Sequence, residues 1–110
     1  MKLSYSSSRL EKTVASLTAI AKYYGNRAKI INQRLKDLEA ARNLETMKTL
    51  GGNCHELSGN LKGKLAISTS GNRRIIFEPS DNPVPVKEDG GLDWSKVTEI
   101  IITDIDIDYH

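Results

Sequence analysis

The sequence has only one cysteine, Cys54, among its 110 residues. A single thiol excludes an internal disulfide and any metal cage built from several thiolates, and it fits a reducing compartment. No stretch approaches the roughly 18 consecutive apolar residues that a membrane-spanning helix needs. Residues 1–14 also lack the apolar core of a signal peptide, so we expect a cytoplasmic protein without membrane contact.

Motifs for metals and nucleotides are also missing. The two histidines, His55 and His110, are far apart, and the chain has no His-x-x-His or Cys-x-x-Cys spacing. Asp104, Asp106 and Asp108 alternate, but solvation of a strand and suppression of edge pairing explain them more simply than a metal does. A phosphate-binding loop is absent as well. We therefore expect no metal and no cofactor.

The charge of the chain is unevenly distributed. Residues 1–74 carry 14 Lys/Arg and 5 Asp/Glu, whereas residues 75–110 carry 2 and 9, so a net charge of +9 is followed by −7. The basic section suits a polyanion such as RNA. Solvation of two amphipathic helices explains the same charges equally well.

The first part of the chain predicts two helices. In residues 8–24, Ser8 and Glu11 have the spacing of a capping box, and Gly25 is a suitable end. Residues 27–42 carry an apolar stripe at helical spacing, and residues 43–50 predict a further turn or two. The short link between the helices favours an antiparallel helical hairpin over 8–42. The stripe consists of Ala28, Ile31, Leu35 and Leu38.

After Gly52 the pattern becomes that of strands. Short β-branched segments at 64–69 and 73–79 are separated by a Ser-Gly-Asn turn, and residues 98–108 form a third strand. A shorter strand precedes them at 53–57. Residues 79–97 hold all three prolines and predict a long connection.

Two helices followed by strands predict an α+β fold in one domain, residues 1–110. The helical hairpin is expected to pack on a small antiparallel β-sheet built from residues 53–110. Alternation along the last strand predicts that the odd positions up to Ile107 pack on the core. It also predicts that Asp108 and His110 share a polar face with Arg74 and Lys64.

These polar residues supply what RNA cleavage requires. RNA carries its own nucleophile, the 2′-hydroxyl, so the reaction needs a proton acceptor, a proton donor and positive charge on the phosphate. Histidine exchanges protons near neutral pH, and arginine offers a fork to two phosphate oxygens. Each residue alone also has an ordinary surface or capping role. The candidates are His55, Lys62, Lys64, Arg73, Arg74, Tyr109 and His110.

Several spaced motifs together resemble the HigB-like toxins of the RelE/ParE superfamily. They are His55, "LSG" at 57–59, "GKLAIS" at 63–68, "NRRIIF" at 72–77 and the terminal "DYH" at 108–110. The resemblance implies a RelE-like fold and a type II toxin–antitoxin toxin. Such a toxin is a ribosome-dependent endoribonuclease that cuts translated mRNA in the A site by 2′-hydroxyl attack, without metal.

The resemblance also implies residue roles and partners. His55 and His110 match the active-site histidines, Arg74 matches the arginine that holds the scissile phosphate, and Asp108 and Tyr109 match the terminal acid and phenol. Lys62 and Lys64 match a basic loop by character, and Arg73 stands where an aromatic residue often occurs. The implied partner is a HigA-like helix-turn-helix antitoxin with an acidic surface, through which the toxin meets DNA only indirectly.

Two other functions are compatible with the same fold. Toxins of the ParE branch block DNA gyrase without cutting RNA, and they need neither the two histidines nor the Asp-Tyr-His ending. A non-catalytic module that binds RNA or the ribosome through its basic surface is the third hypothesis.

Overall fold

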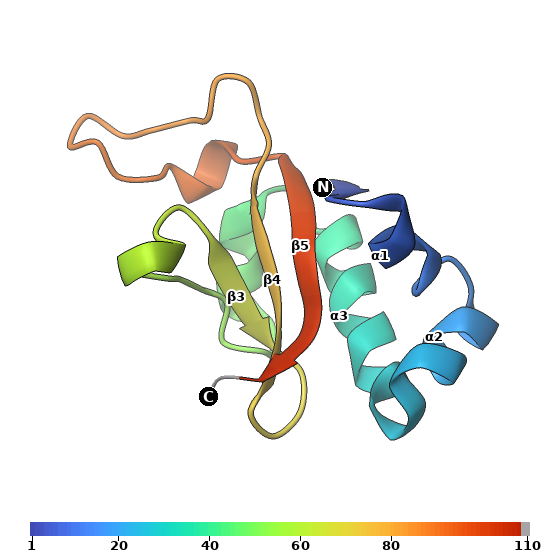
Figure 1. Cartoon of the computed structure of the whole chain (residues 1–110). Helices are drawn as coiled ribbons and strands as arrows, with labels where there is room; N and C mark the ends of the chain where they lie inside the picture. The colour runs from blue at the N-terminus through green and yellow to red at the C-terminus, as the bar shows by residue number, and fades with distance from the viewer. Residues whose placement is uncertain (109–110) are drawn as a thin grey trace.

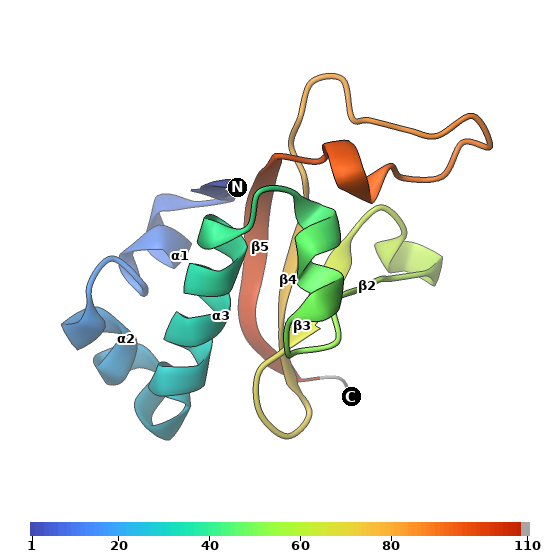
Figure 2. The same cartoon turned by 180° about the vertical axis from the view of Figure 1, so that it is seen from behind.

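The computed structural model describes residues 1–108, so Tyr109 and His110 lie outside the described residues. Five strands form one sheet in the order β1-β5-β4-β3-β2, and helices cover one of its faces (Figures 1 and 2). The predicted α+β fold is confirmed. The strands are β1 (Lys2–Tyr5), β2 (His55–Glu56), β3 (Leu65–Ser68), β4 (Arg73–Pro79) and β5 (Glu99–Asp108).

The predicted helix over residues 8–24 is wrong in one respect, because the structure divides it into two helices. The hydroxyl of Thr13 donates to the carbonyl of Leu10 at 2.7 Å as the first helix ends. Ser16 then starts the second helix by accepting a hydrogen bond from the amide of Ala19 at 3.1 Å. The two helices are α1 (Ser8–Lys12) and α2 (Leu17–Tyr24).

The helical hairpin itself is present, formed by α2 and α3 (Ala28–Ala40) with the short 3₁₀ helix η1 (Gly25–Arg27) between them. Gly25 ends α2 with a φ of 56°, as predicted. Helix α3 and the 3₁₀ helix η2 (Leu44–Thr49) lie against the sheet, and α2 lies outside α3 (Figure 2). Two further 3₁₀ helices are η3 (Gly59–Leu61) and η4 (Trp94–Lys96).

The hydrophobic core lies between α3, η2 and the sheet. Three of the four residues of the predicted stripe, Ile31, Leu35 and Leu38, are buried there. Phe77 and Ile102, which pair across β4 and β5, are fully buried on the same side of the sheet. The apolar spacing of α3 therefore identified the surface that packs on the sheet.

Strand β1 was not predicted, and it changes the character of the sheet. It runs parallel to β5, with Lys2 opposite Glu99 and Tyr5 opposite Ile102, so the sheet is mixed and draws on more than residues 53–110. A four-residue strand carries little periodic signal. Its partner lies almost a whole chain length away, so only the tertiary structure brings the two together.

Strand β5 contradicts the predicted alternation because it contains irregularities. Its register against β4 shifts between Arg74 and Ile76 and again between Ile76 and Phe77. Ile102 is therefore buried on the helix side and so is Ile105, although three positions separate them. Ile107, predicted to pack on the core, is 38% exposed. Each extra residue in a bulged strand reverses the faces of the residues that follow.

The long connection runs from Ser80 to Thr98 and projects beyond the sheet (Figure 1). Its two ends are tied together by Asp81, whose carboxylate accepts from the amide and hydroxyl of Thr98 at 3.1 and 3.0 Å. Trp94 in η4 donates its indole N–H to Glu56 at 2.9 Å. Within residues 1–108, no helix is long and apolar enough to cross a membrane.

Candidate functional site

The sheet face turned away from the helices carries three of the six predicted site residues that the structure describes, namely His55, Lys64 and Arg74. We call it the open face. Strand register places His55, Ala66, Ile76 and Asp104 in one row across β2, β3, β4 and β5. The next row consists of Ser68, Arg74 and Ile107.

His55 and Arg74 thus lie on the same face, one row apart, with β3 between their strands. Ordinary sheet spacings put their Cα atoms roughly 12 Å apart. Both side chains are long enough to approach one phosphodiester group from two sides. The open face therefore brings together a histidine and the arginine that was predicted to bind the scissile phosphate.

The imidazole of His55 is held in one tautomer by a backbone carbonyl two residues earlier in the chain. Nδ1 lies 2.8 Å from the carbonyl oxygen of Asn53. A carbonyl oxygen only accepts hydrogen bonds, so Nδ1 carries the proton and donates it. In the neutral imidazole, Nε2 then has the lone pair and can accept a proton from a substrate.

A tight turn before β2 makes this contact possible. Gly52 has a φ of 104° and Asn53 a φ of 49°. A Cβ at Gly52 would lie 2.5 Å from Cγ1 of Ile67, so only glycine fits against β3 there. The amide of Ser68 donates to the Gly52 carbonyl at 2.7 Å, which ties the turn to the end of β3.

Cys54, the neighbour of His55, takes no part in the open face. Its side chain lies in the hydrophobic core, where burial raises the pKa of the thiol from 9.0 to about 12. The thiol is therefore neutral at physiological pH. A Cys–His nucleophilic pair is excluded, in agreement with the alternation along the strand.

Arg73 has a different setting from Arg74. Register pairs it with Asp108, and its Nη1 donates to the carbonyl oxygen of Asp106 at 3.0 Å. The residue predicted to contact RNA thus already uses one of its donors to hold β5. Its role in RNA binding stays a prediction.

The predicted position of Asp108 beside Arg74 is wrong. Register sets Ile107 opposite Arg74 and Asp108 opposite Arg73. The physical reason is the extra residue in β5 at Asp106, whose φ of 65° reverses the alternation. Tyr109 and His110, predicted as catalytic residues, lie outside the described residues, so their contribution stays a prediction.

The two predicted RNA-binding lysines both follow η3 in the chain. Lys64 precedes Ala66 by two positions, so alternation directs it to the open face. Lys62 is exposed and lines a groove of about 740 Å³ between residues 56–65 and the long connection. The walls of this groove are largely apolar, with Leu57, Val84, Val86 and Leu92 among them.

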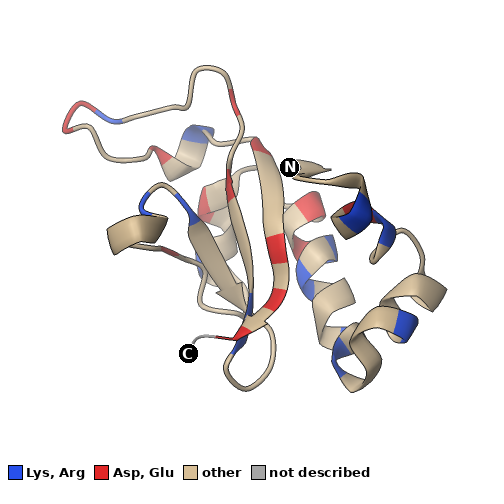
Figure 3. Ribbon diagram, viewed as in Figure 1, with Lys and Arg blue, Asp and Glu red and all other residues tan. Residues whose placement is uncertain are grey.

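Sequence reasoning missed Asp104 as a member of the His55 row. Acidic residues follow one another along β5, whereas many basic residues lie on the helices (Figure 3). Asp104 accepts a hydrogen bond from the hydroxyl of Thr103 at 3.0 Å. Alternation did place Asp104 on the polar face of the last strand, but only the strand register shows that it lies in the same row as His55. Among residues 1–108, no group of three or more His, Cys, Asp or Glu side chains is arranged to hold a metal ion.

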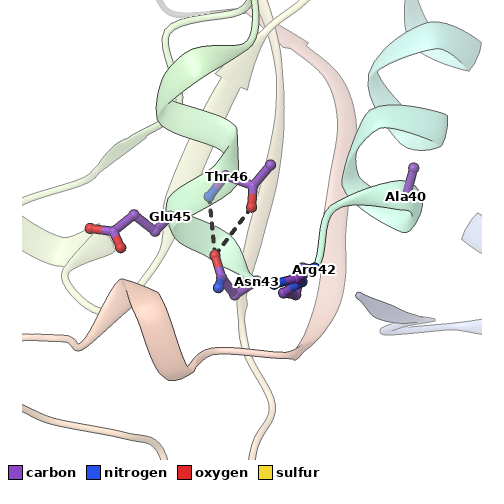
Figure 4. Close-up of a pocket in the computed structure, with 5 residues that line it drawn as sticks. All are labelled: Ala40, Arg42, Asn43, Glu45 and Thr46. Atoms are coloured by element: carbon purple, nitrogen blue, oxygen red, sulfur yellow. Dashed lines mark hydrogen bonds between the residues drawn. The ribbon is translucent and has the colours of Figure 1, made fainter.

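A depression of about 560 Å³ at the start of η2 has a structural explanation (Figure 4). Asn43 caps η2, accepting hydrogen bonds from the amide and hydroxyl of Thr46 at 3.1 and 3.2 Å. The residues that line the depression are those at the start of η2, and they lie on the helix side of the sheet. This depression is separate from the open face.

The sequence matches no family model, and no curated protein matches it. Solved structures match the fold across nearly the whole chain. A YoeB/ParE toxin from Agrobacterium tumefaciens has a TM-score of 0.59 and 12% identity, covering 99% of this chain and 100% of that chain. A YoeB–YefM complex from Staphylococcus aureus has a TM-score of 0.57 and 16% identity, covering 99% and 98%. A YoeB dimer from the same organism has a TM-score of 0.56 and 15% identity, covering 99% and 98%. At these identities the likeness shows a shared fold, that of YoeB/ParE toxins.

Proposed function

We propose that this protein is the toxin of a type II toxin–antitoxin system and cleaves translated mRNA in the ribosomal A site, without metal. The observation that carries the proposal is the meeting of His55 and Arg74 on the open face of a sheet with a toxin fold. The histidine is already set in the tautomer that a general base requires. The fold alone does not specify this chemistry.

In the proposed reaction, Nε2 of His55 accepts the proton of the ribose 2′-hydroxyl. The 2′-oxygen attacks the adjacent phosphorus, and the bond from phosphorus to the 5′-oxygen breaks, leaving a 2′,3′-cyclic phosphate. Arg74 neutralises the charge that develops on the non-bridging oxygens. His110 is the proposed acid that protonates the 5′-oxygen, with Asp108 and Tyr109 supporting it.

The proposed partner is an antitoxin. One similar structure is a complex of YoeB with YefM, and the basic helices α1 to α3 suit an acidic partner (Figure 3). The HigB-like subtype and its helix-turn-helix antitoxin remain proposals that rest on the spaced motifs from His55 to the terminal Asp-Tyr-His. In this proposal DNA is contacted only through the antitoxin.

The proposal is tested with purified protein on ribosomes programmed with a defined mRNA, mapping the new ends by primer extension. His55→Gln and His110→Ala should each lower the cleavage rate by roughly 10²–10⁴-fold. Lys2→Gln, an exposed change at the opposite end of the sheet, serves as the control. Wild-type cleavage by both histidine variants would refute the proposed chemistry.

A DNA gyrase supercoiling assay separates the remaining hypotheses. Inhibition of gyrase without mRNA cleavage would favour the ParE-like function. Ribosome binding without either activity would favour a non-catalytic binding module.

A further inference from the structure

The carboxylate of Asp106, near the end of β5, forms a forked ion pair with Arg27, which lies in the connection between α2 and α3. Nε of Arg27 lies 2.8 and 2.9 Å from the two carboxylate oxygens, and Nη2 lies 2.6 Å from Oδ2. The Asp106 side chain is only 9% exposed. The two residues are 79 positions apart, so the contact joins distant parts of the chain. The forked geometry resists rotation better than a single hydrogen bond does.

The backbone of Asp106 is held as well. Arg73 on the neighbouring strand donates from Nη1 to the Asp106 carbonyl oxygen at 3.0 Å. Asp106 has a φ of 65°, in the left-handed region that most residues avoid and that aspartate tolerates better than most. Two arginines from two elements thus hold one residue by its side chain and its carbonyl. We call Arg27, Arg73 and Asp106 the β5 clamp.

The clamp lies where β5 contains the second of its two extra residues. Register pairs Ile76 with Asp104 and Arg74 with Ile107, so β5 has one residue more than β4 between these pairs. Ile105 is buried on the helix side, whereas Ile107 stands opposite Arg74. The conformation of Asp106 therefore sets the register of Ile107 and Asp108 against β4.

We propose that Arg27 and Asp106 are positioning residues for RNA cleavage, holding the bulge of β5 so that Ile107 stays opposite Arg74 and Arg74 keeps its place on the open face. This inference rests on the proposed function. Asp106 is nearly buried and bound to Arg27, so it acts through the residues that follow it and does not contact RNA. Arg73 supports the same residue from β4.

Four variants separate positioning from simple stability. Arg27→Gln and Asp106→Asn each remove the ion pair, and asparagine still tolerates the left-handed backbone. Arg27→Lys keeps the charge but loses the fork. Ile31→Val is the stability control, because it trims the fully buried core of α3 without touching the clamp.

Cleavage of mRNA on programmed ribosomes should show the effect in kcat. A misplaced catalytic group lowers the rate by on the order of 10²-fold. We expect that loss in Arg27→Gln and Asp106→Asn with KM nearly unchanged, a smaller loss in Arg27→Lys, and near-normal kcat in Ile31→Val. Losses no greater than that of Ile31→Val, or a change in KM alone, would overturn the inference.

Hydrogen exchange of the Ile107 and Asp108 amides gives a readout that needs no activity. Exchange should be faster in Arg27→Gln and Asp106→Asn and unchanged at these amides in Ile31→Val. If the wild type cleaves no mRNA, the proposed function fails while the exchange experiment still tests the clamp. Unchanged exchange in both clamp variants would refute the clamp even where cleavage is intact.

Discussion

At the scale of single residues, the state of His55 depends on neighbours that carry no chemistry of their own. The Asn53 carbonyl selects its tautomer, and the turn at Gly52 brings that carbonyl within reach. Both Gly52 and Asn53 have a positive φ, a backbone conformation that residues other than glycine seldom adopt. The backbone conformation of this turn thus determines which nitrogen of the imidazole is free to accept a proton.

Gly52→Ala should destabilise the protein by at least about 2 kcal/mol, because the added Cβ meets Ile67 and the φ of 104° disfavours alanine. Gly25→Ala is the matched control. Gly25 also has a positive φ, but a Cβ there meets nothing within 4 Å, so the expected loss is about 1 kcal/mol. Urea unfolding of both variants measures the difference, and equal losses would show that the contact with Ile67 is unimportant.

The buried thiol of Cys54 predicts a pH dependence of stability. Its pKa is 9.0 ordinarily and about 12 in the fold, so above pH 9 the unfolded chain binds fewer protons than the folded one. The free energy of unfolding should therefore fall as pH rises from 9 toward 12, by up to about 1.4 kcal/mol per pH unit from this group.

Comparison with Cys54→Ala isolates that effect, because the tyrosines whose pKa burial also raises, Tyr5 and Tyr24, remain in the variant. Urea unfolding at several pH values between 8 and 11 should give a steeper decline for the wild type. Parallel declines would show that the thiol ionises as readily in the fold as in the unfolded chain.

At the scale of elements, helix starts depend on one side chain in the right register. The spacing of Ser8 and Glu11 predicted a cap at Ser8, but Ser7 has the extended backbone of an N-cap and accepts from the Leu10 amide at 3.1 Å. The prediction was wrong by one residue because three consecutive serines offer the same chemistry. Only the direction in which the chain leaves β1 selects among them.

Ser7→Ala should therefore cost about 1 kcal/mol of stability, the usual effect of losing an N-cap. Ser8→Ala should have almost no effect, because Ser8 lies within the first turn of α1. Urea unfolding compares the two variants directly. If Ser8→Ala lost more stability than Ser7→Ala, Ser8 would be the N-cap, as the sequence predicted.

At the scale of the whole molecule, the separation of charge in the sequence becomes a separation in space. Basic residues gather on the helices and acidic ones along β5 and the long connection (Figure 3). On the open face, Arg74 lies one row from Asp104 on the neighbouring strand, and alternation directs Lys64 to the same face. Binding to a polyanion should therefore depend on a few local cations more than on the net charge of +2.

Lys64→Gln should weaken binding to programmed ribosomes and lower the slope of log affinity against log salt by about one. Lys2→Gln removes the same charge from an exposed position at the far end of the sheet and should leave the slope unchanged. Filter binding over a range of salt concentrations measures both. Equal changes in slope would mean that only the total charge of the protein matters, and they would contradict a direct phosphate contact at Lys64.

The sequence by itself determined the α+β class, the stripe of α3 and the residue types available for RNA chemistry. These follow from local periodicity and from side-chain chemistry, which short stretches of sequence express fully. Only the tertiary structure decided the parallel pairing of β1, the reversal of alternation in β5, the tautomer of His55 and the grip of Arg27 on Asp106. The strand pairings and the grip on Asp106 join segments far apart in the chain, and the His55 contact depends on a turn packed against β3, so local patterns carry no record of them.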